Sequence, residues 1–261
     1  KELEAAAKGS NVPDRLVYQL YGLIWGCVDL LYPPQCGGCS VQGARWCPKC
    51  ASSLEWIEPP VCVVCGQPQE REQICSQCQA APPTWDHLRS VARYGGQLRN
   101  AIHALKYRRD LGMGESLSRH LIDLYRTLNW KVDLIVSVPL DLARMQERGY
   151  NQVSLLAIPL GLSFGIAYRP KALRKVRQTP RQVTLSAAQR RTNMEGAFLA
   201  EPEAVQGKRV LLVDDVITTG TTLQACCQAL RLAGARDIFV LTLARAGYSK
   251  DKSGQELIDD S

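Results

Sequence analysis

The residues best suited to chemistry lie in one short stretch, residues 210–222, which reads VLLVDDVITTGTT. Residues 210–213 are apolar and have the composition of a buried strand. Two carboxylates follow, Asp214 and Asp215, and a loop of small residues then leads into an apolar-periodic helix. Helix-start N–H groups favour phosphate, and ionised carboxylates accept hydrogen bonds from ribose hydroxyls. The stretch therefore predicts a sugar-phosphate site, whose loop residues are Thr218, Thr219, Gly220, Thr221 and Thr222.

A simpler interpretation of the same stretch is a strand–turn–helix junction in which Asp and Thr only cap the helix. A single acid before a Thr-Gly turn would deserve that interpretation. Two adjacent acids after a buried strand, followed by a five-residue hydroxyl and glycine loop, are more specific. A Walker nucleotide-binding loop is excluded because the chain contains no G-x-x-x-x-G-K-[ST] segment.

The cysteines form the second group with metal or redox chemistry. Nine of the eleven precede residue 80, and eight of those form four C-x-x-C pairs: Cys36/Cys39, Cys47/Cys50, Cys62/Cys65 and Cys75/Cys78. Two residues between ligands let one tight turn present both sulfurs to a single tetrahedral ion. Four such pairs predict two Cys₄ zinc sites. Because a closed Cys₄ site has no open coordination position, we expect these sites to be structural.

The order in which the pairs combine stays open from the sequence. Pairing in chain order leaves intervals of seven and nine residues between the pairs of each site, as in a double zinc ribbon. A cross-braced arrangement, in which the first and third pairs share one ion, is the alternative. A disulfide scaffold is disfavoured because no secretory signal is visible. Few apolar residues lie between residues 36 and 80, so the metal must supply much of the folding energy there.

The formal net charge is +7. Eight thiolates and two Zn²⁺ would lower it to about +3, so the basicity is local rather than global. Residues 169–191 carry eight Lys and Arg residues and no acid. Such a segment is either a solvated face or an anion-binding segment for phosphates or nucleic acid.

The beginning of the chain predicts a helix and no membrane span. Residues 1–10 are typical of a helical linker or an expression scar. Residues 11–32 predict an amphipathic helix that ends at Pro33 and packs Cys27 within it. Its apolar part is too short to cross a membrane and contains Asp29. We expect a cytoplasmic protein.

The remaining chain predicts the elements that position these groups. Strands are expected at 87–94, 133–138 and 237–243, and helices around 98–105, 117–128 and 150–162, the last disturbed by Pro159 and Gly161. Strands that alternate with helices predict an α/β fold with a parallel sheet and helices on both faces.

A second strand of this sheet also ends in a marked loop. Ligands bind beyond the carboxyl ends of parallel strands, and residues 133–138 lead into the loop Ser137, Val138, Pro139 and Leu140. Arg144 and Arg148 follow, four residues apart, which places them on one face of a helical segment. Two forked guanidinium groups suit a diphosphate. The alternative is a solvent-facing pair.

These motifs together resemble type I phosphoribosyltransferases and, within them, the ComF family of competence-associated proteins. The likeness is carried, in chain order, by the four C-x-x-C pairs; YGGQLR at 94–99 with LKY at 105–107; SVPL at 137–140 with ERGYNQ at 147–152; LRKVRQTPRQ at 173–182 with RRTN at 190–193; and DDVITTG at 214–220. Their joint occurrence in this order covers most of the chain.

The resemblance implies a double zinc ribbon at 33–80, a phosphoribosyltransferase-like domain at 85–248 and a disordered tail at 249–261. It implies that 5-phosphoribosyl-1-diphosphate (PRPP) with Mg²⁺, or ribose 5-phosphate, binds with its ribose on Asp214 and Asp215 and its 5′-phosphate on the Thr/Gly loop. A basic loop carrying Arg174 and Arg177 would close over the diphosphate.

The resemblance also links the chain to natural DNA uptake. Two functions follow from it, transfer of a phosphoribosyl group with release of diphosphate, or non-catalytic binding of single-stranded DNA or of a competence helicase by a protein that keeps a ribose-phosphate pocket.

Overall fold

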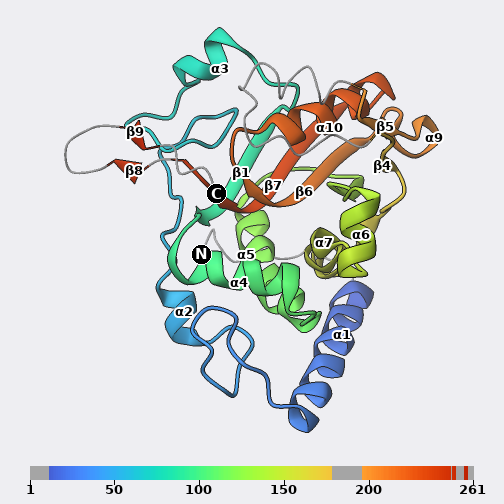
Figure 1. Ribbon diagram of the computed structural model, residues 1–261. Helices are drawn as coiled ribbons and strands as arrows, with labels where there is room; N and C mark the ends of the chain where they lie inside the picture. Colours follow the sequence, from blue (N-terminus) through green and yellow to red (C-terminus); the bar gives the residue numbers. More distant parts are fainter. Residues whose placement is uncertain (1–11, 178–195, 248, 251–255, 258–261) are drawn as a thin grey trace.

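A five-stranded sheet forms the centre of the computed structural model, which describes residues 12–177, 196–247, 249–250 and 256–257. The strand order is β1-β7-β6-β2-β3 and every neighbouring pair is parallel (Figure 1). The strands are β1 (His87–Arg93), β2 (Leu134–Ser137), β3 (Ala167–Tyr168), β6 (Arg209–Ile217) and β7 (Asp237–Arg245). The expected parallel α/β sheet is confirmed.

Helices cover both faces of this sheet. Helices α4 (Gly96–Tyr107), α5 (Gly112–Thr127) and α7 (Gln152–Phe164) lie on one face, and α10 (Thr221–Leu232) lies on the other (Figure 1). The strand side chains alternate between the two layers. On β6, Leu211 and Val213 join the core under α5 and α7, whereas Val210 and Leu212 join the core under α10.

Smaller elements complete the described chain: α1 (Val12–Leu31), α2 (Pro48–Ser52), α3 (Ser76–Ala80), α6 (Leu142–Arg148), β4 (Leu173–Lys175), β5 (Phe198–Ala200), α9 (Pro202–Val205), β8 (Ser249–Lys250) and β9 (Glu256–Leu257). Strands β4 and β5 form an antiparallel hairpin over α10, and β8 pairs with β9. The β8–β9 pair falls in the segment expected to be a disordered tail, and that expectation stays a prediction. The linker at 1–10 and residues 178–195, which include residues 178–191 of the basic segment, lie outside the described residues.

Two elements run further than their sequence pattern indicates. Helix α7 continues through Pro159 to Phe164. Proline removes one helical hydrogen bond, but Leu156 and Leu160 on either side of it are fully buried in the core, so packing holds the helix together. Strand β6 continues past the apolar run to Ile217 because β7 keeps pairing with it after β2 has ended.

No helix among the described residues is long and apolar enough to cross a membrane.

Candidate functional site

The eight paired cysteines form two separate groups. One contains Cys36, Cys39, Cys47 and Cys50, and the other contains Cys62, Cys65, Cys75 and Cys78; within each group the four sulfurs lie within 4.8 Å of one another. The pairs therefore combine in chain order, and the cross-braced alternative is wrong. The Sγ–Sγ distances are 3.6 Å for Cys36–Cys50 and 3.7 Å for Cys65–Cys75. Zn–S bonds of about 2.3 Å at tetrahedral angles place sulfurs about 3.8 Å apart, so both groups fit a structural Zn²⁺.

Backbone N–H groups prepare one sulfur in each group to be a thiolate. The N–H of Cys47 lies 3.4 Å from the Cys36 sulfur, and that of Cys75 lies 3.3 Å from the Cys62 sulfur. Burial raises the pKa of both thiols, but the backbone donors outweigh it and lower each pKa to about 6. Because the thiolate is the form that binds a metal, these donors favour loading at neutral pH.

Both ribbons dock on the body of the molecule rather than extending from it. In the first, Asn100 of α4 donates to the Gly38 carbonyl at 3.1 Å, and Trp46 Nε1 donates to His120 Nε2 of α5 at 2.8 Å. In the second, the Leu88 N–H of β1 donates to the Val64 carbonyl at 2.7 Å. A Cβ at Gly66 would collide with the Leu88 carbonyl oxygen, so only glycine permits this approach. Trp46 and Trp56 both pack edge-on against His120.

The acidic pair lies near the carboxyl end of β6, within the strand rather than after it. Asp214 is in register with Thr242 of β7. Burial, and then the negative charge of Asp215, raise the pKa of Asp214 well above its usual range. Asp214 also accepts a hydrogen bond from the Asp215 N–H at 2.9 Å.

Asp215 is 5% exposed and has two polar partners from other elements. Lys106, in the last turn of α4, places its Nζ 3.1 Å from Asp215 Oδ2. Gln152, the first residue of α7, donates to the same oxygen at 3.0 Å. The orientation of the carboxylate is therefore fixed by two residues that are distant in the sequence and come from different helices.

Arg148 extends this network into the interior. It is 6% exposed, donates to Gln152 Oε1 at 2.8 Å and to the Tyr107 hydroxyl at 3.1 Å, and lies over the Tyr107 ring. Its Nε is buried and has no hydrogen-bond partner. Arg144, in contrast, is 39% exposed and lies 3.6 Å from Asp141. The two arginines thus occupy different surroundings, and Arg148 reaches the acidic pair only through Gln152.

The loop after β6 turns sharply into helix α10. Gly220 adopts φ +76, a left-handed conformation that favours glycine, and no side chain caps the helix that starts at Thr221. The first N–H groups of α10 are therefore not used by a capping side chain. The Thr219 and Thr221 hydroxyls lie 3.0 Å apart, and Thr218 and Thr219 are exposed. Uncapped helix-start N–H groups beside hydroxyls are groups that can donate hydrogen bonds to an anion.

The loop after β2 lies directly beside the acidic strand. Ser137 pairs in register with Val213, and the Val138 N–H donates to the Val213 carbonyl at 3.0 Å. The Ser137 hydroxyl is 2.8 Å from that of Tyr168, and Asn151 donates to the Val138 carbonyl at 3.0 Å. Pro139 and Leu140 are partly exposed. The backbone of residues 138–140, rather than the Ser137 side chain, is thus the part that adjoins the acids.

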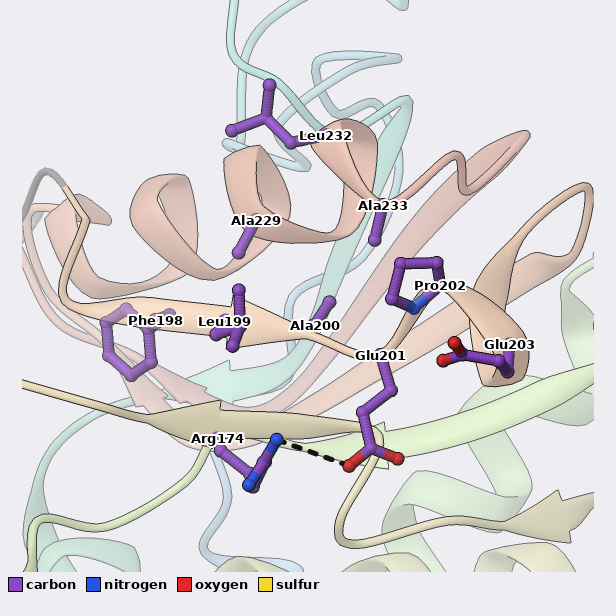
Figure 2. Close-up of a pocket in the computed structure, with 10 residues that line it drawn as sticks. All are labelled: Arg174, Phe198, Leu199, Ala200, Glu201, Pro202, Glu203, Ala229, Leu232 and Ala233. Carbon is purple, nitrogen blue, oxygen red and sulfur yellow. Dashed lines mark ion pairs between the residues drawn. The ribbon is translucent and has the colours of Figure 1, made fainter.

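Arg174, expected near the diphosphate, lies beside a different pocket. It lies on β4, 3.5 Å from Glu201, and lines a pocket of about 420 Å³ (Figure 2). The other lining residues include Leu199 on β5 and Ala229 and Leu232 in the C-terminal half of α10. The Thr/Gly loop is at the opposite end of that helix. As placed here, Arg174 therefore does not adjoin the acidic pair, while Arg177 is exposed at the edge of the undescribed residues 178–195.

Lys106 and Gln152 were missed as site residues from the sequence. Both stand in the segments that carry the family likeness, LKY at 105–107 and ERGYNQ at 147–152. A lysine at the end of an apolar-periodic helix, together with an acidic pair that needs a counter-charge, was the available signal.

Comparison with known proteins agrees with this architecture. The family of the double zinc ribbon domain matches residues 27–79, and that of the phosphoribosyl transferase domain matches residues 114–260. DNA utilization protein YhgH of Escherichia coli O157:H7 is 36% identical over 86% of this chain and 97% of its own length. Competence protein F of Haemophilus influenzae is 32% identical over 81% of this chain and 90% of its own.

Among solved structures, an adenine phosphoribosyltransferase from Thermoanaerobacter pseudethanolicus is 22% identical over 52% of this chain and 82% of its own, with a TM-score of 0.34. The two family matches and the relatives cover both halves of the molecule. This chain, a double zinc ribbon followed by a phosphoribosyl transferase domain, therefore belongs to the ComF family of competence proteins.

Proposed function

We propose that this protein binds PRPP, or ribose 5-phosphate, at the carboxyl end of β6 and acts as a phosphoribosyltransferase-like protein of DNA uptake. The observation that carries the proposal is one juxtaposition. An acidic pair, of which Asp215 is buried and held by Lys106 and Gln152, lies one tight turn before the uncapped start of α10.

Each part of the ligand has a matching group in this arrangement. The 5′-phosphate would accept hydrogen bonds from the N–H groups and hydroxyls of residues 218–222. The ribose hydroxyls would donate to Asp214 and Asp215. The diphosphate would lie along the backbone of residues 138–140, with Arg144 at its rim and Mg²⁺ held mainly by diphosphate and water.

The reaction would form a bond between ribose C1 and a nitrogen of the acceptor while the bond between C1 and the diphosphate oxygen breaks. The electron pair of that bond leaves with diphosphate, and the acceptor's proton passes to water or buffer. Both relatives named above refer to competence or DNA utilization, which supports an acceptor, or a second ligand, that arises from incoming DNA.

A second function shares the same pocket. The polar side chains described next to Asp215 are a lysine and a glutamine, and neither is a general base matched to neutral pH. This favours a binding protein that recognises a ribose-phosphate end of single-stranded DNA without turnover. Release of diphosphate from PRPP during incubation with candidate acceptors separates the two functions.

The proposal is tested by the double variant Asp214→Asn with Asp215→Asn. Each lost charge-assisted hydrogen bond costs about 1.5–3 kcal/mol, so affinity for PRPP with Mg²⁺ should fall by at least about a hundredfold. Calorimetry on one preparation should compare PRPP, ribose 5-phosphate and single-stranded DNA.

The matched control is Asp123→Asn, which removes an exposed carboxylate of α5 paired only with Arg126 of the same helix. It should leave all three affinities unchanged. Unchanged PRPP affinity in the double variant, with the melting temperature preserved, would contradict the ribose assignment.

A further inference from the structure

Helix α1 carries two different apolar faces, and only one of them packs against the other residues that the structure describes. On the inner face, Tyr18 packs against the main core, and Arg45 of the first ribbon lies over the Trp25 ring and pairs with Asp29. Tyr21 and Trp25, which contact each other edge-on, are partly buried. These contacts along the helix fix which face is turned outward.

The outer face is aliphatic and exposed. The exposed large apolar residues of this segment are Leu16, Val17, Leu20, Leu23, Ile24, Val28, Leu30, Leu31 and Tyr32, with exposed fractions from 36% to 84%. A fully exposed large apolar residue presents about 200 Å², so the set leaves on the order of 1,000 Å² of apolar surface. A standard interface buries about 800 Å² per partner. The face is therefore large enough to be one half of a stable interface.

The spacing on this face is that of a helix–helix seam. Leu16, Leu20, Leu23, Cys27 and Leu30 follow one another at intervals of four, three, four and three residues. This is the a/d repeat of two packed helices, and Cys27 occupies a central seam position. Cys27 is exposed, so the expectation that it packs within this molecule is wrong. Val17, Ile24 and Leu31 repeat every seven residues and widen the stripe on one side.

We propose that this face docks on the same face of a second copy of the chain, forming a homodimer through paired α1 helices. Residues 16–32 contain no Lys or Arg, and their single acid, Asp29, is engaged with Arg45. Two copies of the outer face thus meet without charge repulsion. A lipid-binding helix carries basic residues beside its apolar stripe and aromatic anchors within it. Here no basic residue lies between residues 16 and 32, and Tyr18, Tyr21 and Trp25 are partly buried, so Tyr32, beyond the end of the helix, is the exposed aromatic residue of this segment.

A seam of two heptads is too short to hold two free peptides together. Here, however, α1 is already folded against α7 and the first ribbon. Because α1 is already ordered in the monomer, dimerisation does not have to supply the free energy of ordering it. The apolar area buried between two copies therefore contributes to association.

The first test is the mass of the full chain by sedimentation across a concentration series. The parent protein should approach twice the monomer mass. Leu20→Glu with Leu23→Glu places four carboxylates in the paired seam and should weaken the dimer by at least about a hundredfold. The matched control is Leu232→Glu, because Leu232 is 83% exposed on α10 and lies away from α1. This control should remain dimeric.

The direction of pairing is read by cross-linking with a short bismaleimide. Parallel helices bring Cys27 against its counterpart, so the parent should cross-link and Cys27→Ser should not. Antiparallel helices centre on Leu23, so Leu23→Cys in the Cys27→Ser background should cross-link instead. The zinc content of each sample should be measured, because loss of zinc would show that the reagent has reacted with the metal-binding cysteines.

Three outcomes would overturn the proposal. The parent chain is monomeric at every concentration; or the dimer persists in the Leu20→Glu, Leu23→Glu variant; or neither cysteine position cross-links in a sample that is dimeric. Flotation with phosphatidylcholine–phosphatidylglycerol vesicles identifies the competing occupant. A monomer whose vesicle binding is abolished by the two glutamates assigns the face to a lipid surface.

Discussion

At the residue scale, the two adjacent carboxylates have different surroundings. Asp215 is buried against the Lys106 ammonium and the Gln152 amide. Asp214 faces the opposite way along the alternating strand, and burial together with its neighbour's charge raises its pKa. A ribose hydroxyl donates to an ionised carboxylate, so the protonation of Asp214 decides how well the pair holds a sugar.

This difference predicts a pH dependence of ligand affinity. Because the pKa of Asp214 lies well above its usual range, the carboxylate becomes protonated while the pH is still above the range of an ordinary aspartate. Affinity for ribose 5-phosphate should therefore fall as the pH is lowered, and the fall should begin at a higher pH than an ordinary Asp would give. Calorimetry over a pH series measures it, with the Asp123→Asn variant as control.

The same shift has an opposite effect on stability. A carboxyl whose pKa is raised by folding destabilises the fold fully above the raised pKa; this cost shrinks as the pH falls below that value and is gone below the pKa of the unfolded chain. Asp214→Asn should thus raise the melting temperature of the unliganded protein at neutral pH, by an amount that shrinks toward acid pH. A lower melting temperature at neutral pH would show that the carboxylate is stabilised in the fold and would sink the predicted pH dependence.

At the element scale, the parallel sheet and its long helices were predictable because their patterns are local. The apolar runs of β2, β6 and β7 and the period of α4 and α5 identify these elements without knowledge of their neighbours. The ends of elements were not predictable in the same way. β6 reaches Ile217 only because β7 pairs with it, and the three-residue strands β4 and β5 exist only as a hairpin packed on α10.

The residues of the candidate site also divide into those that a local pattern predicts and those that depend on tertiary structure. The acids and the Thr/Gly loop are contiguous and were predicted from one segment. Lys106 and Gln152 reach Asp215 from α4 and α7, so their roles depend on a tertiary arrangement that local patterns do not contain. Burial of Arg148 under Tyr107 likewise depends on how α6 meets α4.

The turn into α10 predicts that a substitution at Gly220 lowers both the stability of the protein and its affinity for the ligand. Gly220→Ala forces a side chain into a left-handed conformation with φ +76. This should cost about 1–2 kcal/mol and lower the melting temperature by about 2–8 °C. Binding of ribose 5-phosphate should weaken as well, because the turn aims the first N–H groups of α10.

Gly207→Ala is the matched control, since Gly207 also has a positive φ, +68, with open space around it, but lies before the opposite end of β6. It should lower the melting temperature similarly and leave binding unchanged. Equal loss of binding in both variants would mean that the turn acts only through general destabilisation.

At the scale of the whole molecule, the two four-cysteine groups predict two Zn²⁺ per chain. Metal analysis should find both, and chelation should lower the melting temperature by about 10 °C or more because the ribbons have little apolar core of their own. Cys27→Ser, Cys226→Ser and Cys227→Ser should each keep both ions, since none of these residues belongs to a four-cysteine group. Fewer than one zinc per chain, or intact disulfides by mass spectrometry, would refute the assignment.

Helix α4 touches both the first ribbon and the acidic pair. Asn100 binds the Gly38 carbonyl between Cys36 and Cys39, and Lys106, six residues and about 9 Å further along the same helix, pairs with Asp215. A rigid helix that contacts both places would transmit a displacement of one to the other. Linkage is reciprocal: if the proposed sugar phosphate changes the zinc affinity of the first four-cysteine group, zinc in that group would change the affinity of the acids for the sugar phosphate by the same factor.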